Sequence, residues 1–242
     1  MDNIIFSFVL PTYNERDNIR ILIPSIIQAF SDFKIEIIVV DDGSKDGTLE
    51  IIKNFQTQYP NIRLIKRDFL GGIGSALKDG YSAALGQYII SVDADLSFSA
   101  EDLKKIGNLL LTNQYDLVIG SRHMKGGYYQ AINFNIFKKK AISVIGNNFI
   151  RLMTNLPFHD FSANCRGLKN EKWKQLNLAD NSNFMLFEMI AQSYRKNFKI
   201  IELPVTFLDR KFGKAKLKLE KEALRSFFKF MKSKYLRIYS KK

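Results

Sequence analysis

The sequence predicts an α/β fold in which a mostly parallel central sheet is flanked by helices. Two observations support this prediction: short apolar runs alternate with amphipathic stretches up to about residue 120, and Ile35–Val40 is apolar except for Glu36, as in strands buried on both faces. Strands that alternate with helices form parallel sheets through right-handed crossovers. Because 46% of the 242 residues are hydrophobic, the chain can fill the core of one large domain.

The expected elements alternate regularly in the first half of the chain. Strands are expected at Ile4–Leu10, Ile35–Val40, Ile62–Lys66, Tyr88–Val92 and Asp116–Gly120. The intervening helices are expected at Asn18–Phe30, Thr48–Gln58, Ser75–Leu85 and Ala100–Leu111. Ser99, with Asp102 three residues later, forms a plausible N-terminal cap for the last of these helices.

The regularity ends after Gly120. Gly126–Tyr129 is expected to be a mobile loop. The later elements are expected to be a lysine-bearing helix at Phe134–Met153, a strand near Asp160–Leu168, a helix at Phe184–Lys196, a strand at Lys199–Phe207 and a last helix from Leu219. No internal repeat or low-complexity linker marks a second domain.

Positive charge is concentrated at the C-terminal end. Between Arg210 and Lys242 there are 13 Lys or Arg and two Glu, whereas the preceding 209 residues hold 24 basic and 22 acidic residues. Such a tail is attracted to phosphate on nucleic acid, on an anionic membrane or on a substrate. From Leu224 onward, apolar residues also recur on one helical face. The helix either packs this face on the body of the protein or binds an anionic lipid surface, and both hold if its basic edge faces lipid.

The remaining composition limits the possible sites and compartments. A single cysteine, Cys165, excludes an intramolecular disulfide and fits a reducing compartment. With only His123 and His159, any metal site must rely mainly on oxygen ligands. No apolar run approaches the roughly 20 residues of a membrane-spanning helix, and the N-terminus does not look like a signal peptide. We expect a cytoplasmic protein, peripheral on the cytoplasmic face of a membrane.

Polar motifs follow four of the expected strands, namely Pro11–Glu15, Asp41–Ser44, Asp93–Asp95 and Ser121–Arg122. Ligands of parallel sheets bind outside the carboxyl ends of the strands, so these motifs should converge there. Like charges repel unless a cation joins them, and a turn at Asp93–Asp95 could aim both carboxylates at one Mg²⁺ or Mn²⁺ ion. The alternatives are that Asp41 and Asp42 cap the next helix, and that Asp95 is exposed in a helix-start turn.

Two further features admit a simpler interpretation. Gly72–Gly74 could suggest a dinucleotide-binding turn, but it follows the third strand and no acidic residue ends the next one in the ribose-binding pattern, so we reject that interpretation. Glu188 could be a catalytic base, but a carboxylate on an amphipathic helix is more often solvated, and we favour the solvated position.

As a set, the motifs resemble those of the inverting family 2 glycosyltransferases, and most closely the dolichol-phosphate mannosyltransferases and their polyprenyl-phosphate relatives. They are Pro-Thr-Tyr-Asn-Glu at 11–15, Asp-Asp-Gly-Ser at 41–44, Gly-Ile-Gly-Ser-Ala at 72–76, Asp-Ala-Asp-Leu-Ser at 93–97, Gly-Ser-Arg at 120–122 and Asp-Arg-x-x-Gly at 209–213. The resemblance covers nearly the whole chain. It implies a GT-A type, Rossmann-like fold, a nucleotide-sugar donor and a divalent cation, Mg²⁺ or Mn²⁺.

The resemblance also implies roles for individual residues. The nucleotide sugar would be bound by Pro11, Tyr13, Glu15, Val40, Asp42, Asp93, Ala94, Asp95, Ser97, Arg122, Arg210 and Lys216. Asp93 and Asp95 would hold the metal, and Asp95 and Arg122 would be catalytic. The acceptor phosphate would be bound by Arg122, Lys138, Lys139 and Lys140.

The implied organisation is a GT-A catalytic domain, 1–217, followed by a basic amphipathic C-terminal helix and tail, 218–242. Within the domain, the nucleotide-sugar half extends to about 122 and the acceptor half covers about 123–217. The chain departs from the family at Gly213–Lys216, where Ala215 replaces a serine, and at Phe69–Gly71, where the usual lysine or asparagine is missing. Most relatives carry a membrane segment or use an anchoring subunit, so a membrane-anchoring protein partner is possible.

The expected reaction is the metal-dependent, inverting transfer of a hexose, mannose from GDP-mannose in the first instance, to a polyprenyl phosphate. A phosphate acceptor needs no general base, whereas a sugar hydroxyl does. Apolar residues beside the lysines would suit a lipid, or alternatively belong to the core: Phe134, Phe137, Ile142, Val144, Ile145 and Phe149.

Two other functions compete with this one. The first is a UDP-sugar-dependent, glycan-elongating transferase, although the surroundings of Trp173 lack the Gln-x-x-Arg-Trp motif of processive members. The second is a non-enzymatic nucleic-acid or membrane-binding module. That module leaves the acidic motifs unexplained, so nucleic acid is not expected as a partner.

Overall fold

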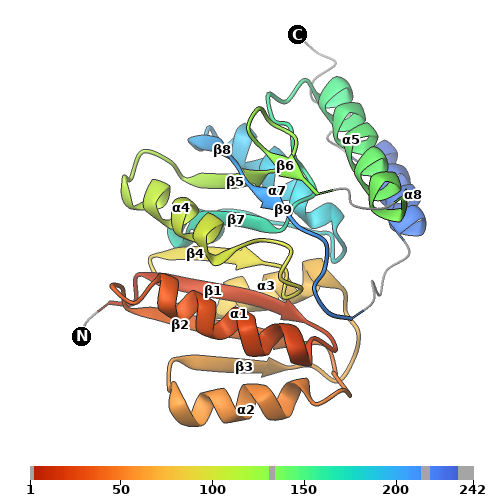
Figure 1. Cartoon of the computed structure of the whole chain (residues 1–242). Helices are drawn as coiled ribbons and strands as arrows, with labels where there is room; N and C mark the ends of the chain where they lie inside the picture. Colours follow the sequence, from red (N-terminus) through yellow and green to blue (C-terminus); the bar gives the residue numbers. More distant parts are fainter. Residues whose placement is uncertain (1–2, 131–133, 214–218, 234–242) are drawn as a thin grey trace.

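The computed structural model describes residues 3–130, 134–213 and 219–233. Its centre is a seven-stranded sheet in the order β3-β2-β1-β4-β7-β5-β8 (Figure 1). The strands are β1 Phe6–Thr12, β2 Ile35–Asp41, β3 Ile62–Lys66, β4 Tyr88–Val92, β5 Leu117–Ser121, β7 Cys165–Lys169 and β8 Ile200–Pro204. All neighbouring strands are parallel except for the two pairings made by β7. The predicted mostly parallel sheet is therefore confirmed.

Helices cover both faces of this sheet. They are α1 Arg16–Ala29, α2 Thr48–Gln58, α3 Ile73–Ala83, α4 Ala100–Leu111, α5 Phe134–Thr154, α6 Asn170–Trp173, α7 Phe184–Arg195 and α8 Leu219–Lys232. Alternate strand residues feed two cores: Phe6 and Phe8 pack with α1 and α4, while Val9 packs with α3 and α7. All residues of β2 are buried, as the apolar run predicted, and Glu36 within it is buried too. The predicted cap is also present, because Ser99 Oγ accepts a hydrogen bond from the Asp102 N–H at 3.1 Å.

The second half differs from the prediction in three places. The strand expected near Asp160–Leu168 begins only at Cys165, and it runs antiparallel between β4 and β5. Instead of the mobile loop expected at Gly126–Tyr129, the structure has strand β6, Tyr128–Tyr129, paired with β9, Thr206–Phe207. The strand expected at Lys199–Phe207 is therefore divided between two sheets.

The C-terminal helix α8 packs on the body along part of its apolar face. Phe230 is buried against Phe149 of α5 and Phe187 of α7, and Lys229 bonds to Asp180 at 2.5 Å. The packing alternative is thus correct for this part, while Phe228 remains 53% exposed. Helix α8 itself holds four Lys or Arg and two Glu, so most of the basic tail lies outside the described residues.

Two further findings concern the described residues: they include no membrane-spanning helix, and Glu188 is buried. In these parts of the chain, no helix combines the length and apolarity needed to cross a membrane. The prediction that Glu188 is solvated is wrong: its side chain is buried in α7, and its Oε2 accepts a hydrogen bond from the Asp180 N–H at 2.8 Å. This contact fixes the loop before α7 in the way that a helix-capping group would.

Candidate active site at the carboxyl edge of the sheet

The loops after β1 and β2 are hydrogen-bonded to each other. The Asn14 N–H donates to Ser44 Oγ at 2.7 Å, and the Glu15 N–H donates to Thr48 Oγ1 at 3.0 Å. Pro11 and Val40 are register partners on adjacent strands. The structure therefore brings the first two motifs together, as the strand-end argument predicted.

The nucleoside-contact residues predicted here differ in exposure. Pro11 and Tyr13 are half-buried, whereas Glu15 and Val40 are buried. The Val40 side chain is buried in the core beneath α3.

Asp41 and Asp42 do not cap the next helix, so that alternative is wrong. Asp41 closes its own turn, accepting hydrogen bonds from the Gly43 N–H at 3.1 Å and the Ser44 N–H at 2.9 Å. Asp42 binds Arg67. The Arg67 Nε donates to Asp42 Oδ1 at 2.6 Å, and the Arg67 Nη2 donates to the same oxygen. Both side chains of this pair are less than 10% exposed.

Asp42 also anchors the glycine-rich turn that precedes α3. Its Oδ2 accepts hydrogen bonds from the N–H groups of Gly71 at 3.1 Å and Gly72 at 3.2 Å. A side chain on Gly74 would meet the Ser182 carbonyl oxygen at 2.4 Å, so only glycine fits at that position. Asp42 thus connects the ends of β2 and β3 to the N-terminus of α3.

Asp93 and Asp95 lie in a turn and not in an exposed helix start. Leu96 adopts a left-handed backbone conformation with φ of 63°, and Asp95 Oδ1 accepts a hydrogen bond from the Ser97 N–H at 3.1 Å. Ala94 and Ser97 are buried beside them. Burial is the main cause that raises the pKa of Asp93 to about 7, and the negative charge of Asp95 is the second. The cost of holding two carboxylates together is what a bound cation would relieve.

Arg210 joins two of the acidic motifs. Its guanidinium donates to Glu15 Oε1 at 2.9 Å and to Asp95 Oδ2 at 3.0 Å, and its side chain is 22% exposed. The end of β1 and the end of β4 are thereby bridged by a residue more than 100 positions later in the chain. Lys216, predicted to bind phosphate beside it, lies outside the described residues.

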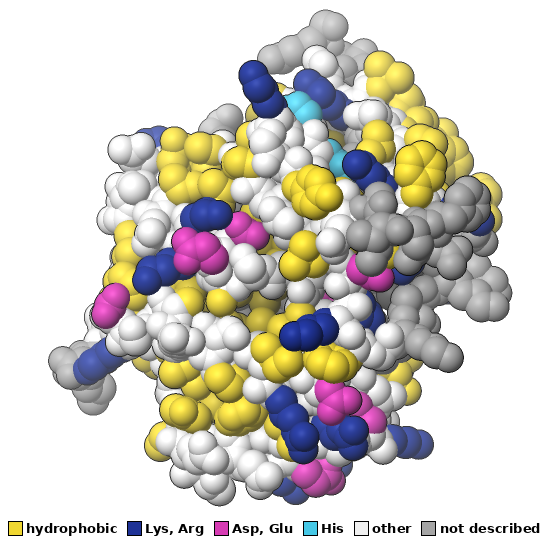
Figure 2. Space-filling view, viewed as in Figure 1, with side chains coloured by type: hydrophobic (Ala, Val, Ile, Leu, Met, Phe, Trp, Pro, Cys, Tyr) yellow, Lys and Arg dark blue, Asp and Glu magenta, His cyan; other side chains and the backbone are white. Residues whose placement is uncertain are grey.

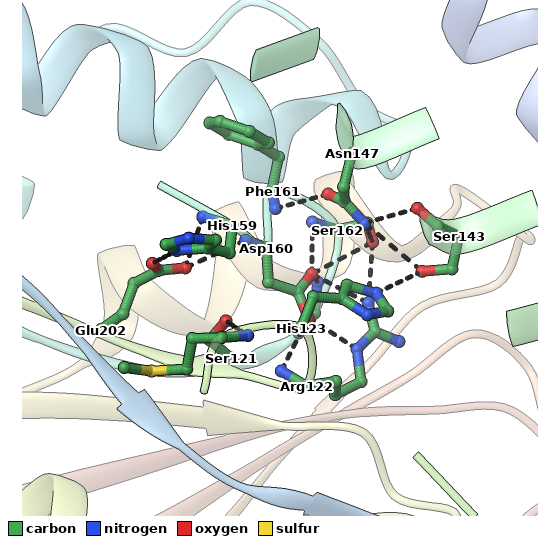
Figure 3. A network of polar contacts seen from close by, with 12 residues as sticks. Ser121, Arg122, His123, Ser143, Asn147, His159, Asp160, Phe161, Ser162 and Glu202 are labelled. Carbon is green, nitrogen blue, oxygen red and sulfur yellow. Dashed lines mark hydrogen bonds and ion pairs between the residues drawn. The ribbon is translucent and has the colours of Figure 1, made fainter. Parts of the chain in front are cut away.

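Arg122 is held by a carboxylate of its own. Its Nε donates to Asp160 Oδ2 at 2.7 Å and a terminal nitrogen to Oδ1 at 2.9 Å (Figure 3). Tyr129 and Phe207 lie against the guanidinium, with ring centroids 5.7 and 5.3 Å away. Although burial opposes the ionisation of Asp160, the Arg122 charge and hydrogen bonds outweigh it and hold the pKa of that carboxyl well below its usual range.

The loop that carries Asp160 is fixed from the opposite side. Glu202 Oε1 accepts hydrogen bonds from the N–H groups of His159 at 2.8 Å and Asp160 at 3.0 Å (Figure 3). Its other oxygen lies 2.7 Å from His159 Nδ1. The Arg122–Asp160 pair therefore sits in a rigid frame.

Helix α5, which carries the predicted acceptor lysines, is tied to the same frame. His123 Nε2 lies 2.9 Å from Ser143 Oγ, and Asn147 Oδ1 accepts a hydrogen bond from the Phe161 N–H at 2.7 Å (Figure 3). Burial, with smaller effects from the charges of Arg122 and Lys140, lowers the pKa of His123. Lys138 is exposed, and Lys139 and Lys140 are half-buried.

The donor set suits a hard divalent cation. Asp93 and Asp95 supply carboxylate oxygens, and in the described parts of the chain no group of three or more His, Cys, Asp or Glu side chains could hold a metal ion. Mg²⁺ accepts such an incomplete protein site because it completes its shell with water and substrate phosphates. The residues present therefore fit a metal–diphosphate site.

Sequence reasoning missed three residues that organise this edge: Arg67, Asp160 and Asn164. Asn164 donates to Asp93 Oδ1 at 2.9 Å. Asp160 and Asn164 precede β7, and because β7 is antiparallel, its beginning lies where β4 and β5 end. The direction of this strand would have been the signal for Asp160 and Asn164, whereas Arg67 directly follows the expected strand Ile62–Lys66.

The model of glycosyl transferase family 2 matches residues 7–176. This chain belongs to glycosyl transferase family 2. The family predicted from the motifs is confirmed, and the structure has the GT-A fold of its solved relatives.

Two curated relatives of this family 2 member share most of its length. It is 32% identical over 233 residues to a dolichol-phosphate mannosyltransferase of Pyrococcus furiosus, covering 93% of this chain and 63% of that protein. It is 26% identical over 216 residues to a polyprenol monophosphomannose synthase of Mycolicibacterium smegmatis, covering 86% and 79%. The chain thus spans less than two thirds of the Pyrococcus protein.

Solved structures show the fold at lower identity. Glucosyl-3-phosphoglycerate synthase of Mycobacterium tuberculosis, in complex with Mn²⁺, UDP and glucosyl-3-phosphoglycerate, aligns with a TM-score of 0.65 at 17% identity, over 93% of this chain and 79% of that one. S. aureus TarS, with UDP-GlcNAc, aligns with a TM-score of 0.59 at 20% identity, over 87% and 60%.

Proposed function

We propose that this protein transfers a hexose, with inversion, from a nucleotide sugar to a polyprenyl phosphate, and that the donor is GDP-mannose. The observation that carries the proposal is the position of α5. This helix bears Lys138–Lys140, is tied to the end of β5 beside Arg122, and leaves Phe137 and Ile145 59% and 69% exposed. Positive and apolar groups side by side suit a phosphate on a lipid. The names of the two curated relatives point to the same acceptor class.

The state of the carboxylates favours an acceptor that needs no deprotonation. Five carboxylates at this edge are engaged: Asp42 by Arg67, Glu15 and Asp95 by Arg210, Asp93 by Asn164, and Asp160 by Arg122. A sugar hydroxyl would need one of them as a general base, whereas a phosphate is already anionic.

The proposed division of roles follows from the geometry. The loops after β1 and β2, with the turn held by Asp42, would bind the nucleoside, and Arg210 would contact phosphate oxygens. A Mg²⁺ or Mn²⁺ ion held by Asp93 and Asp95 would neutralise charge on the departing diphosphate. Arg122 and Lys138–Lys140 would hold the acceptor phosphate for in-line attack.

The proposal is tested by offering matched acceptors. With Mn²⁺ and GDP-mannose, a short polyprenyl phosphate should receive the sugar in an acid-labile linkage, and the dephosphorylated alcohol should not. Replacing Lys138, Lys139 and Lys140 by Ala should raise the KM for the acceptor more than that for the donor. Replacing Lys53, Lys104 and Lys105 on α2 and α4, which removes the same charge elsewhere, should change neither. Preferred transfer to a sugar hydroxyl would show that the assignment is wrong.

A UDP-sugar donor is the second candidate, because the solved relatives of this fold were crystallised with UDP or UDP-sugars. A screen of the common sugar nucleotides against the same acceptor decides between GDP-mannose and a UDP-sugar. Turnover with a UDP-sugar alone would replace the proposed donor while keeping the proposed acceptor.

We further propose that the protein works on the cytoplasmic face of a membrane, directly or through an anchoring protein. Exposed apolar side chains gather over α5 (Figure 2) and continue on α8. Each Lys or Arg at an anionic surface contributes about 1 kcal/mol, so four basic residues give about a thousandfold in binding. Sedimentation should show salt-sensitive binding to anionic vesicles and none to neutral ones. Equal binding to both, or to neither, would contradict direct membrane attachment.

A further inference from the structure

Behind Asp93, three buried side chains form a continuous hydrogen-bonded chain. The hydroxyl of Tyr81, on α3, lies 2.6 Å from Ser91 Oγ, on β4. Ser91 donates to Asn164 Oδ1 at 2.6 Å, and Asn164 Nδ2 donates to Asp93 Oδ1 at 2.9 Å. Tyr81, Ser91 and Asn164 are each 1% exposed or less. The chain therefore begins in the core beneath α3 and ends on a carboxylate of the candidate active site.

The direction of every hydrogen bond in this chain follows from its end. When Asp93 is ionised, the form that binds a cation, its carboxylate only accepts, so Asn164 turns its NH₂ group toward Asp93 and its oxygen toward Ser91. Ser91 has one proton, which it gives to that oxygen, and it must then accept from Tyr81. Each member thus has one orientation that satisfies its neighbours, and the amide cannot rotate without breaking two bonds at once.

The two carboxylates of the motif differ in how they are held. Asp95 is bonded to the Ser97 N–H within its own turn and to the partly exposed Arg210. Among the described residues, Asn164 is the one that hydrogen-bonds to Asp93. The orientation of Asp93 therefore depends on a residue 71 positions away on the loop before β7.

We infer that Asn164, oriented by Ser91 and Tyr81, is a positioning residue that sets the affinity of Asp93 for a divalent cation without touching the ion. The inference rests on the proposed function, because that function supplies the cation. Partners that orient metal ligands usually change metal affinity about 10- to 100-fold when they are removed.

The test is Mn²⁺ binding followed by electron paramagnetic resonance, for Mn²⁺ alone and with GDP or UDP. Asn164→Leu keeps the side-chain volume but loses the amide, and it should weaken Mn²⁺ binding by about 10- to 100-fold. Tyr81→Phe should weaken it by a smaller, measurable factor. Tyr88→Phe is the matched control. Tyr88 lies at the end of β4 away from Asp93, and it is also a buried tyrosine whose hydroxyl bonds to a remote partner, Asn113.

The outcomes separate this inference from the proposed function. If the unaltered protein binds no Mn²⁺ in any condition, the metal part of the proposed function fails. If it binds Mn²⁺ and folded Asn164→Leu binds equally well, only the positioning role is overturned. Should Asn164→Leu not fold, Ser91→Ala tests the same amide, and unchanged Mn²⁺ affinity there overturns the inference. Equal effects of Tyr81→Phe and Tyr88→Phe would remove Tyr81 from the chain of positioning residues.

Discussion

Arg122 and Arg210 reach the same edge of the sheet from two regions that hold them differently. Arg122, after β5, is buried in a bidentate pair with Asp160, a carboxylate that makes no other ion pair among the described residues. Arg210, after β9, is partly exposed and is divided between Glu15 and Asp95. Arg122 thus has a carboxylate of its own, and Arg210 uses carboxylates that belong to two of the strand-end motifs.

This difference predicts which substitutions lower the stability of the protein and which lower its activity. Removing one partner of a buried ion pair leaves an uncompensated buried charge and is strongly destabilising, whereas partly exposed pairs contribute little. The Arg122–Asp160 region should therefore respond to substitution mainly in folding. The Arg210–Asp95 region should respond mainly in catalysis.

The largest expected effect is that of Asp160→Asn. It leaves the Arg122 guanidinium buried without a counter-charge, so the free energy of unfolding should fall by about 3–5 kcal/mol in urea denaturation. Arg122→Met combined with Asp160→Asn should recover part of that loss, because no buried charge then remains. A loss below about 1 kcal/mol would contradict the expected difference between the two arginines, since that is the size expected for an exposed ion pair.

The same pair gives a pH signature. The folded pKa of Asp160 is held below its unfolded value of about 3.9, so its stabilisation is complete above that value and is lost as the pH falls toward the folded pKa. Below about pH 4, the stability advantage of the unaltered protein over Asp160→Asn should shrink by up to about 1.4 kcal/mol per pH unit. A difference that stays constant down to pH 2.5 would contradict the depressed pKa.

A smaller effect, and one on rate, is expected for Asp95→Asn. Losing one carboxylate of a metal–diphosphate site should slow sugar transfer by about 100-fold, or about 2.7 kcal/mol of transition-state stabilisation. The free energy of unfolding should change by less than about 1 kcal/mol, because among the described residues the ion pair of Asp95 is with a partly exposed arginine. Initial rates with saturating Mn²⁺, together with denaturation curves, measure both. Near-normal turnover in chelator-treated buffer would rule out the role given to this residue.

The first half of the chain could be predicted closely because its signals are local. In the parallel βα units, the residues that follow each strand lie at one edge, so Glu15, Asp42 and Asp95 could be placed from the sequence alone. What could not be predicted was the partner of each charge. Arg67 lies on the neighbouring strand's loop, but Arg210 reaches Asp95 from 115 residues away.

The second half was harder because strand direction is set by tertiary pairing. A strand was expected near Asp160–Leu168. Its antiparallel direction depends on hydrogen bonds to β4 and β5, and no pattern in the sequence of β7 indicates that direction. Asp160 and Asn164 precede this strand, so a search for polar residues after strand ends passes over both. Glu188 was misplaced for a similar reason, since its burial depends on the loop that it anchors.

The place of β7 also has a consequence for how the molecule is assembled. β4 and β5 are synthesised first but do not pair with each other, because β7 lies between them. Until that later segment enters, both strands present open edges, which favour pairing with other chains, and Asp93 and Arg122 lack their buried partners. Closing such long-range contacts is intrinsically slow. A nucleotide sugar or cation whose binding needs these buried partners can bind only chains in which β7 has entered the sheet. By mass action, such a ligand would favour the complete sheet during folding.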